Sequence, residues 1–364
     1  MTPLISYIAP SAPATRCPAT GGEAFFRPEI GFTPAWYRCA LGIDFGERWH
    51  NDVDYRRETV VAMRAELRRR FPGSAVGGTG RPDAPLDLLT GVYGGKAVPA
   101  LFGLPIVYAA DNWPDVQHRY LRPDQMASME APDLDTNPFF QRLLAQVDRI
   151  VGIEGRCEGF LNWQGVLNVA QQLRGQELFS DLYEAPAACH RLFEVVMETI
   201  IQATRRLRER QRRSGTDYRF ATVSNCVVNM ISPEHYRRFL LPCDLRIADA
   251  FESIGVHNCA WRADPYLESY ASIPNLAYID MGLDSDLARA RELMPAARRA
   301  LMYTPMDLAN KSEAALRSDF ERIARDYAPC DLVIADIEAD VPDQRVRFAI
   351  EICRELSDHR DELP

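Results

Sequence analysis

Short apolar runs alternate with long amphipathic ones along most of the chain, and this alternation restricts the fold more than any other feature. Eight runs have the length and composition of buried β-strands. They cover residues 24–26, 105–110, 158–162, 220–224, 255–258, 276–280, 300–303 and 332–336. Strands that alternate with helical patterns pair in parallel through right-handed crossovers, and eight such units close into a barrel. The sequence therefore predicts an α/β fold with a single (β/α)8 TIM barrel.

The 364 residues suffice for one barrel with additions. Residues 1–22 are rich in Pro, Ala, Ser and Thr and predict a flexible N-terminal arm. Residues 23–364 predict the barrel, with a helical extension over about residues 33–72. A doubly wound sheet is the alternative, but no expected strand is followed by a glycine-rich phosphate loop. The glycine-rich segment 73–95 follows a helix and is interpreted as a flexible loop, with a phosphate cradle as the alternative.

Composition and charge narrow the class of protein. No apolar run approaches the roughly 18 residues of a membrane helix, and the N-terminus lacks a secretion signal, so we expect a cytoplasmic protein without a membrane partner. The net charge of −9 argues against nucleic acid, and the basic cluster at residues 205–210 is interpreted as a solvated helix face, with docking of an acidic protein as the alternative. The nine scattered cysteines predict thiols rather than a disulfide framework. The sequence leaves open whether the protein forms a homodimer.

Polar side chains follow the expected strands, at the end of a barrel where catalytic groups gather. We expect Asp111 and Asn225 to be catalytic, with Asp111 as general acid or substrate anchor, although capping of the following turn is its alternative. The residues expected to bind substrate are Asn112, Trp113, Asn162, Trp163 and Thr304. The two tryptophans suit stacking on a flat or cationic substrate, or else packing in the core.

The tripeptide 257–259 predicts a metal site. His257 and Cys259 are two residues apart at a strand end, so both side chains face the same way and offer a nitrogen and a sulfur to zinc. Asp280 and Glu338 follow two other strands and are the expected oxygen ligands. Cys226 is a reserve candidate with buried packing as its alternative, and a buried pair is likewise the alternative for the tripeptide.

Two stretches resemble the uroporphyrinogen decarboxylase superfamily. They are residues 165–186 and residues 231–259, and the resemblance extends from about residue 100 to the C-terminus. Members of the superfamily are (β/α)8 barrels. The decarboxylases bind substrate propionates with an arginine-bearing loop after the first strand, whereas residues 27–32 of this chain lack the paired arginines.

The resemblance points to the zinc-dependent methyltransferase branch, which works with methylcobamide and coenzyme M. Zinc in that branch is held by His-x-Cys, an acidic residue and a cysteine after the last strand. His257 and Cys259 match, Asp280 falls at the acidic position, and Glu338 stands where the cysteine is expected.

The resemblance therefore implies zinc and a corrinoid as cofactors, the corrinoid as substrate or on a partner protein. A methyl group would move between the corrinoid and a small ether, amine, thioether or thiol. The alternatives are a metal-free decarboxylase or lyase anchored by Asp111 and Arg27, and a non-catalytic barrel that captures a tetrapyrrole.

Overall fold

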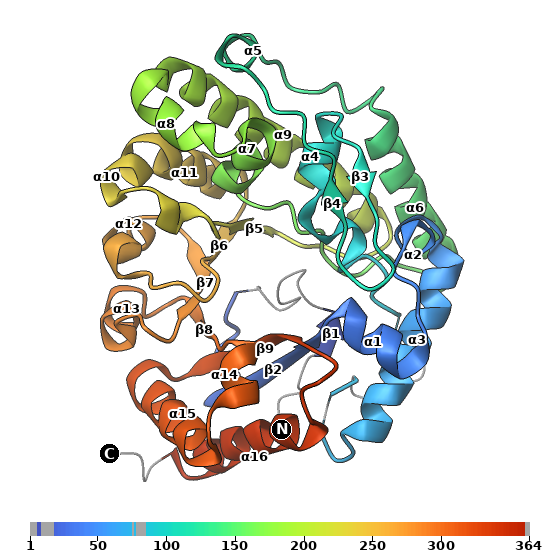
Figure 1. Ribbon diagram of the computed structural model, residues 1–364, viewed down its shortest axis with the longest axis vertical. Coiled ribbons are helices and arrows are strands. Elements are labelled where there is room, and N and C mark those ends of the chain that lie inside the picture. The colour runs from blue at the N-terminus through green and yellow to red at the C-terminus, as the bar shows by residue number, and fades with distance from the viewer. Residues whose placement is uncertain (1–5, 9–17, 75, 78–84, 361–364) are drawn as a thin grey trace.

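The computed structural model describes residues 6–8, 18–74, 76–77 and 85–360. In this part of the chain seven strands form one parallel sheet, in the order β1-β2-β9-β8-β7-β6-β5. The strands are β1 (Ser6–Ile8), β2 (Phe26–Phe32), β5 (Phe220–Ser224), β6 (Ser253–His257), β7 (Leu276–Gly282), β8 (Arg298–Met302) and β9 (Cys330–Ile337). They curve around the centre of the molecule with helices outside them (Figure 1). The fold is TIM-barrel-like, as predicted.

Helices fill most of the remaining described chain. They are α1 (Pro34–Leu41), α2 (Glu47–Asn51), α3 (Val53–Arg70), α4 (Ala97–Leu101), α5 (Pro123–Ala127), α6 (Pro138–Glu154), α7 (Val166–Arg174), α8 (Glu177–Glu184), α9 (Pro186–Arg213), α10 (Pro233–His235), α11 (Leu241–Ala250), α12 (Leu267–Ala271), α13 (Leu287–Leu293), α14 (Pro305–Asn310), α15 (Glu313–Tyr327) and α16 (Asp343–Asp358). Helices α1 to α3 confirm the predicted N-terminal extension. Within the described residues, no helix combines the length and apolar character needed to cross a bilayer.

The first barrel strand differs from its prediction. Residues 24–26 were expected to form it, whereas β2 covers Phe26–Phe32. The charges of Arg27 and Glu29 made this stretch resemble a loop, but both side chains are buried and Arg27 forms an ion pair with Asp331 of β9. Within the predicted arm, β1 pairs with β2, while residues 1–5 and 9–17 lie outside the described chain. Residues 75 and 78–84 of the glycine-rich segment lie outside it as well.

Two of the eight predicted strands are wrong. Residues 105–110 contribute only the short strand β3 (Ile106–Val107), which pairs antiparallel with β4 (Asp115–Val116) and belongs to a separate hairpin. Residues 158–162 form no regular strand, and Gly159 has a left-handed φ of 97°. Backbone groups of that segment bond to side chains instead of a neighbouring strand, for example Gly159 N–H to the Tyr218 hydroxyl. The hydrogen-bonded sheet therefore ends at β5.

Layers of side chains fill the inside of the curved sheet. At the N-terminal ends of the strands, Asp331 is buried between Arg27 and Arg298, whose Nε lies 2.8 Å from the Asp331 carboxylate. An apolar layer of Tyr278, Ala300, Met302, Val333 and Ala335 follows. These ion pairs lie at the N-terminal ends of the strands, whereas sites in barrels of this kind lie at the C-terminal ends.

Gly282 ends β7 where only a glycine fits. An added Cβ would overlap the carbonyl oxygen of Ala260, and the Gly282 N–H donates to the Trp261 carbonyl oxygen at 2.9 Å. We predict that Gly282→Ala lowers the free energy of unfolding by about 2 kcal/mol or more, because the loop after β6 must shift. Urea unfolding monitored by circular dichroism measures the change.

Gly152→Ala is the matched control. Gly152 lies inside α6 and has no atom within 4 Å of an added Cβ, so we expect unchanged stability or a gain of up to about 1 kcal/mol from helix propensity. Equal stability of the two variants would contradict the packing described for Gly282.

Candidate functional site

Two matching tripeptides end neighbouring strands β5 and β6. Ser224 pairs with His257 in the parallel ladder, and the Asn225 N–H donates to the His257 carbonyl oxygen at 2.7 Å. The tripeptides 224–226 and 257–259 therefore run side by side, and each ends in a cysteine. The side-chain ligand atoms of Cys226, His257 and Cys259 lie within 4.8 Å of one another. We call these three residues the thiol–imidazole cluster.

Asp280 fixes the orientation of the His257 ring. The Nδ1 atom of His257 lies 2.7 Å from Oδ2 of Asp280, which is fully buried at the end of β7. The Tyr278 hydroxyl donates to the same oxygen at 3.0 Å, and the Asn258 N–H donates to Oδ1 at 2.8 Å. The Asp280 carboxylate can only accept a hydrogen bond, so the proton of the imidazole lies on Nδ1. The lone pair of Nε2 therefore faces the cysteines. Nε2 lies 3.0 Å from Sγ of Cys259.

The loop after β6 holds Cys259 in a conformation that is uncommon for a residue other than glycine. Cys259 has a φ of 59°, in the left-handed region. The Asn258 side chain accepts a hydrogen bond from the Tyr270 hydroxyl at 2.9 Å, and the Gly282 N–H ties residue 261 to β7. Left-handed residues of this kind cluster at functional sites, where the surrounding structure maintains them.

Cys226 lies in a polar environment on the other side of the cluster. The pKa of its thiol is well below its ordinary value, because Cys259 donates a hydrogen bond to it and because His257 and Asn168 also interact with it, which outweighs the effect of burial. Asn168 of α7 is itself held by the Val227 N–H at 3.2 Å and by the Gln164 side chain at 2.6 Å. Helix α7 therefore supports the cluster from outside the sheet.

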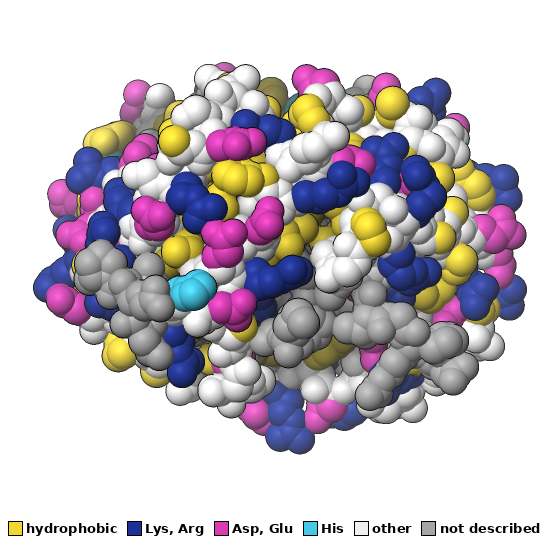
Figure 2. Space-filling model, turned by 90° about the horizontal axis from the view of Figure 1, so that it is seen from below, with side chains coloured by type: hydrophobic (Ala, Val, Ile, Leu, Met, Phe, Trp, Pro, Cys, Tyr) yellow, Lys and Arg dark blue, Asp and Glu magenta, His cyan; other side chains and the backbone are white. Residues whose placement is uncertain are grey.

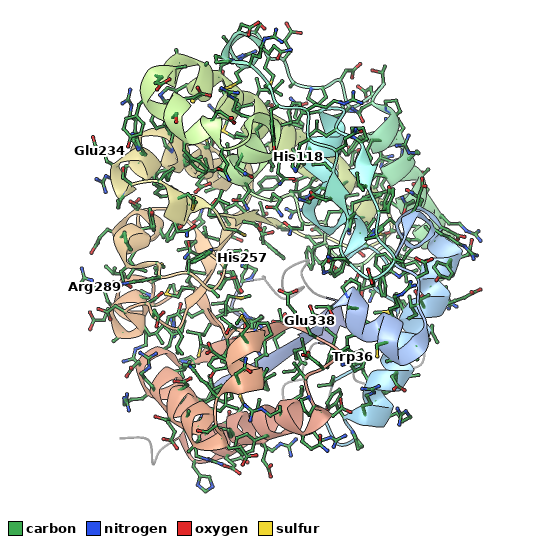
Figure 3. All side chains as sticks on the ribbon, in the orientation of Figure 1. Trp36, His118, Glu234, His257, Arg289 and Glu338 are labelled. Carbon is green, nitrogen blue, oxygen red and sulfur yellow. The ribbon has the colours of Figure 1, made fainter. Side chains whose placement is uncertain are left out.

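Two carboxylates lie at the C-terminal end of β9, Asp336 within the strand and Glu338 just after it. The partly buried Asp336 has its pKa raised to about 6 by desolvation and by Glu338, and the charge of His257 opposes this shift. Glu338 accepts a hydrogen bond from the Thr33 hydroxyl at 3.1 Å. Figure 3 shows the Glu338 and His257 side chains directed toward the centre enclosed by the strands. These carboxylates give the barrel mouth negative charge beside the thiols.

The cluster fits a metal ion by the chemistry of its donors. Two sulfurs and one imidazole nitrogen are the ligand types that zinc prefers, and three protein ligands leave a position for substrate. Of the four predicted ligands, the structure brings His257 and Cys259 together with Cys226. Asp280 contacts the opposite nitrogen of the ring, and neither Asp280 nor Glu338 belongs to the cluster in the described chain.

Cys226 is the member of the thiol–imidazole cluster that sequence reasoning left in reserve. The repeated pattern at residues 224–226 and 257–259, Ser-Asn-Cys and His-Asn-Cys, was the signal that identifies it. Neighbouring parallel strands that end with the same register place equivalent residues side by side. Alignment of the two matching tripeptides would have paired the cysteines.

The predicted catalytic residue Asn225 is buried beneath the cluster. Its Nδ2 donates to Oδ2 of Asp244 at 3.0 Å, and the Tyr236 hydroxyl donates to the same oxygen at 2.6 Å. Burial raises the pKa of Asp244 to about 6 despite these two hydrogen bonds. In the structure Asn225 therefore anchors the loop after β5 to α11.

Trp113 and Asn162 lie on either side of one tight turn. The turn contains Gly94 and Gly95, with left-handed φ values of 53° and 90°. A Cβ at Gly94 would meet the Trp113 ring, and a Cβ at Gly95 would overlap Gln164 and press on Asn162. The Asn162 side-chain oxygen Oδ1 also accepts a hydrogen bond from the Ser224 hydroxyl at 3.3 Å. The turn therefore packs against Trp113 on one side and, through Asn162, lies close to the end of β5 on the other.

The other predicted site residues occupy local structural positions. Asp111 and Asn112 are exposed in the loop between β3 and β4, and the Asn112 side chain accepts from the Trp113 N–H at 2.7 Å. Trp163 is buried, and Thr304 caps the N-terminus of α14. Their roles in substrate binding stay predictions.

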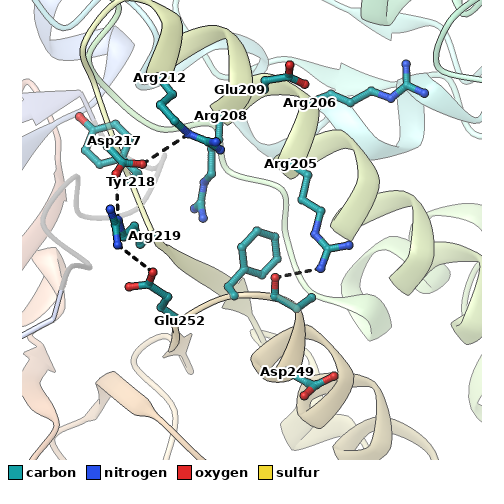
Figure 4. Close-up of a pocket in the computed structure, with 12 residues that line it drawn as sticks. Arg205, Arg206, Arg208, Glu209, Arg212, Asp217, Tyr218, Arg219, Asp249 and Glu252 are labelled. Carbon is teal, nitrogen blue, oxygen red and sulfur yellow. Dashed lines mark hydrogen bonds and ion pairs between the residues drawn. The ribbon is translucent and has the colours of Figure 1, made fainter.

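A separate cleft of about 730 Å³ lies at the N-terminal ends of β5 and β6, away from the thiol–imidazole cluster (Figure 4). Residues of α9 and the segments 217–219 and 249–252 line this cleft. Arg219 pairs with Asp217 at 2.8 Å and Glu252 at 3.0 Å. On the face shown in Figure 2, basic and acidic side chains are likewise interspersed. This pairing neutralises charge beside the cleft, and the solvated basic face expected around residues 205–210 stays a prediction.

Asp244 yields a prediction about pH. Its pKa of about 6 exceeds the ordinary 3.8, so the protonated form stabilises the fold at low pH and this contribution is lost as the pH rises through 6. About two pKa units at about 1.4 kcal/mol each amount to roughly 3 kcal/mol. We expect Asp244→Asn to gain stability relative to the wild type by up to this amount between about pH 3 and pH 7, as measured by urea unfolding at each pH. A pH-independent difference would show that Asp244 does not titrate in this range.

Comparisons with known proteins agree with this architecture. A family model described as uroporphyrinogen decarboxylase (URO-D) matches residues 84–354. A methyltransferase from Methanosarcina mazei has a similar structure, with a TM-score of 0.63 and 14% sequence identity over 97% of this chain and 94% of that one.

A B12-independent methionine synthase from Shewanella sp. W3-18-1 matches with a TM-score of 0.38 and 10% identity over 72% of this chain and 76% of that one. A search of curated protein sequences gives no match. Because the family model spans most of the chain, the protein belongs to the uroporphyrinogen decarboxylase family.

Proposed function

We propose that this protein is a zinc-dependent methyltransferase that moves a methyl group between a corrinoid and a small substrate. The single observation that carries the proposal is the thiol–imidazole cluster at the C-terminal strand ends. Cys226, His257 and Cys259 would hold the metal, and Asp280 would keep the imidazole in the tautomer that binds it. The structural similarity to a methyltransferase supports this choice within the family.

The donor set also favours one class of substrate. Zinc bound here would lower the pKa of a coordinated heteroatom and make it a better nucleophile or leaving group. Two sulfurs and a nitrogen make a softer site than one sulfur with carboxylates. Cys226 in place of Glu338 as third ligand therefore favours a thiol over an ether as the substrate. The corrinoid would approach from the open C-terminal end of the barrel, free or on a partner protein.

The residues around the cluster would perform the remaining tasks. Asp336 and Glu338 place carboxylates at the mouth, where they would exclude anionic substrates and move protons to or from the substrate. The metal-free decarboxylase alternative needs Arg27 and Asp111 in one pocket. Arg27 lies at the opposite end of the sheet in an ion pair with Asp331, and Asp111 is exposed.

Metal analysis combined with turnover tests the proposed function. We expect about one zinc per chain in the purified wild type and far less in Cys226→Ser and His257→Ala. With methylcobalamin and small thiols, the cobalt absorption bands should change in the wild type and stay constant in both variants. Cys39→Ser, which alters an exposed thiol of α1, is the control. Substoichiometric zinc in the wild type, or turnover unaffected by His257→Ala, would refute the proposal.

Substitutions at Asp280 and His257 should lower the zinc affinity to different degrees. Asp280→Asn removes the charge that holds the Nδ1 proton, so the zinc affinity should fall roughly 10–100-fold, whereas His257→Ala should cost more because it removes a ligand. Competition with a chromophoric chelator measures both affinities. Asp286→Asn, at the N-cap of α13, keeps its capping function and should leave zinc affinity unchanged. Wild-type affinity in Asp280→Asn would show that this hydrogen bond does not support the metal site.

A further inference from the structure

The two cysteines of the cluster have the placement of a cross-strand pair. Ser224 and His257 are register partners, and Cys226 and Cys259 each follow two residues later. The ladder continues beyond the paired residues, because Asn225 N–H donates to His257 O. Neighbouring strands lie about 4.8 Å apart, within the range of roughly 4.4–6.8 Å that separates disulfide-bonded Cα atoms. The two sulfurs are within 4.8 Å of each other.

Solvent access distinguishes this pair from most of the other described cysteines. Cys226 and Cys259 are partly exposed. The buried thiols are those of Cys157, Cys189, Cys243, Cys330 and Cys353. Burial raises the pKa of each of these five, so they are poorly ionised and poorly reactive. The one other accessible thiol of the described chain, Cys39, lies on α1 of the N-terminal extension.

We propose that Cys226 and Cys259 form a reversible disulfide when the cluster is free of metal and a peroxide is present. One thiolate attacks the peroxide and becomes a sulfenic acid as the O–O bond breaks and hydroxide leaves. The other thiol then attacks that sulfur, the S–S bond forms, and the sulfenic oxygen leaves as water. Two thiols and one hydrogen peroxide thus yield one disulfide and two water molecules. The disulfide removes both sulfur ligands and blocks metal binding.

This inference rests on the proposed metal cluster, but its first step is tested without metal. The full chain, stripped with a chelator, receives one equivalent of hydrogen peroxide at neutral pH. We expect the loss of two free thiols, a peptide that links Cys226 to Cys259 after proteolysis under non-reducing conditions, and recovery of both thiols with dithiothreitol. The zinc-loaded chain should keep these two thiols reduced over the same time, because the metal holds both sulfurs.

Variants and metal binding complete the experiment. Cys39→Ser should lose the same two thiols as the wild type, whereas Cys226→Ser should form no link to Cys259. The oxidised wild type should bind no zinc and regain binding after reduction. Three outcomes would overturn the proposal: sulfinic acids without a link, a disulfide between Cys259 and another cysteine in Cys226→Ser, or zinc binding that the oxidised wild type retains. If the reduced chain binds no zinc but still forms the link, the proposed function fails while the disulfide stands.

Discussion

The hydrogen bond between Asp280 and His257 organises the whole candidate site. A fully buried carboxylate is costly unless its oxygens are satisfied, and here His257, the Tyr278 hydroxyl and the Asn258 backbone all serve it. The same contacts connect β6 to β7 and fix the imidazole tautomer. A residue that stabilises the strand ends therefore also determines which nitrogen faces the cysteines.

The parallel register of β5 and β6 provides the second constraint. It places two three-residue segments side by side, so that a ligand from one strand end meets two ligands from the next. The family pattern expects the last cysteine after the final strand, where this chain has Glu338. In the proposed metal site, a cysteine after β5 would supply the missing sulfur from the other side of His257 and would preserve a sulfur-rich donor set.

The sequence was sufficient for the general fold and for two of the three residues of the candidate cluster, His257 and Cys259. Buried parallel strands such as 220–224 and 332–336 are continuous apolar runs, and this made them recognisable. Strand β2 was misplaced because Arg27 and Glu29 face the barrel interior, where an ion pair replaces apolar contacts. Residues 158–162 appeared strand-like, but the left-handed Gly159 and side-chain hydrogen bonds replace the ladder there. The hydrophobic periodicity of a sequence carries no information about long-range partners such as Asp331 and Tyr218. The cluster residue Cys226 required the pairing of strands, which depends on register rather than on local composition.

The number of sulfur atoms bound to the metal tests the account most directly. X-ray absorption spectroscopy of the zinc-loaded wild type should show two sulfurs at about 2.3 Å and nitrogen or oxygen ligands at about 2.0 Å. Cys226→Ser should show one sulfur. A wild-type site with a single sulfur and additional oxygen would contradict the assignment of Cys226 and return the third ligand to Glu338.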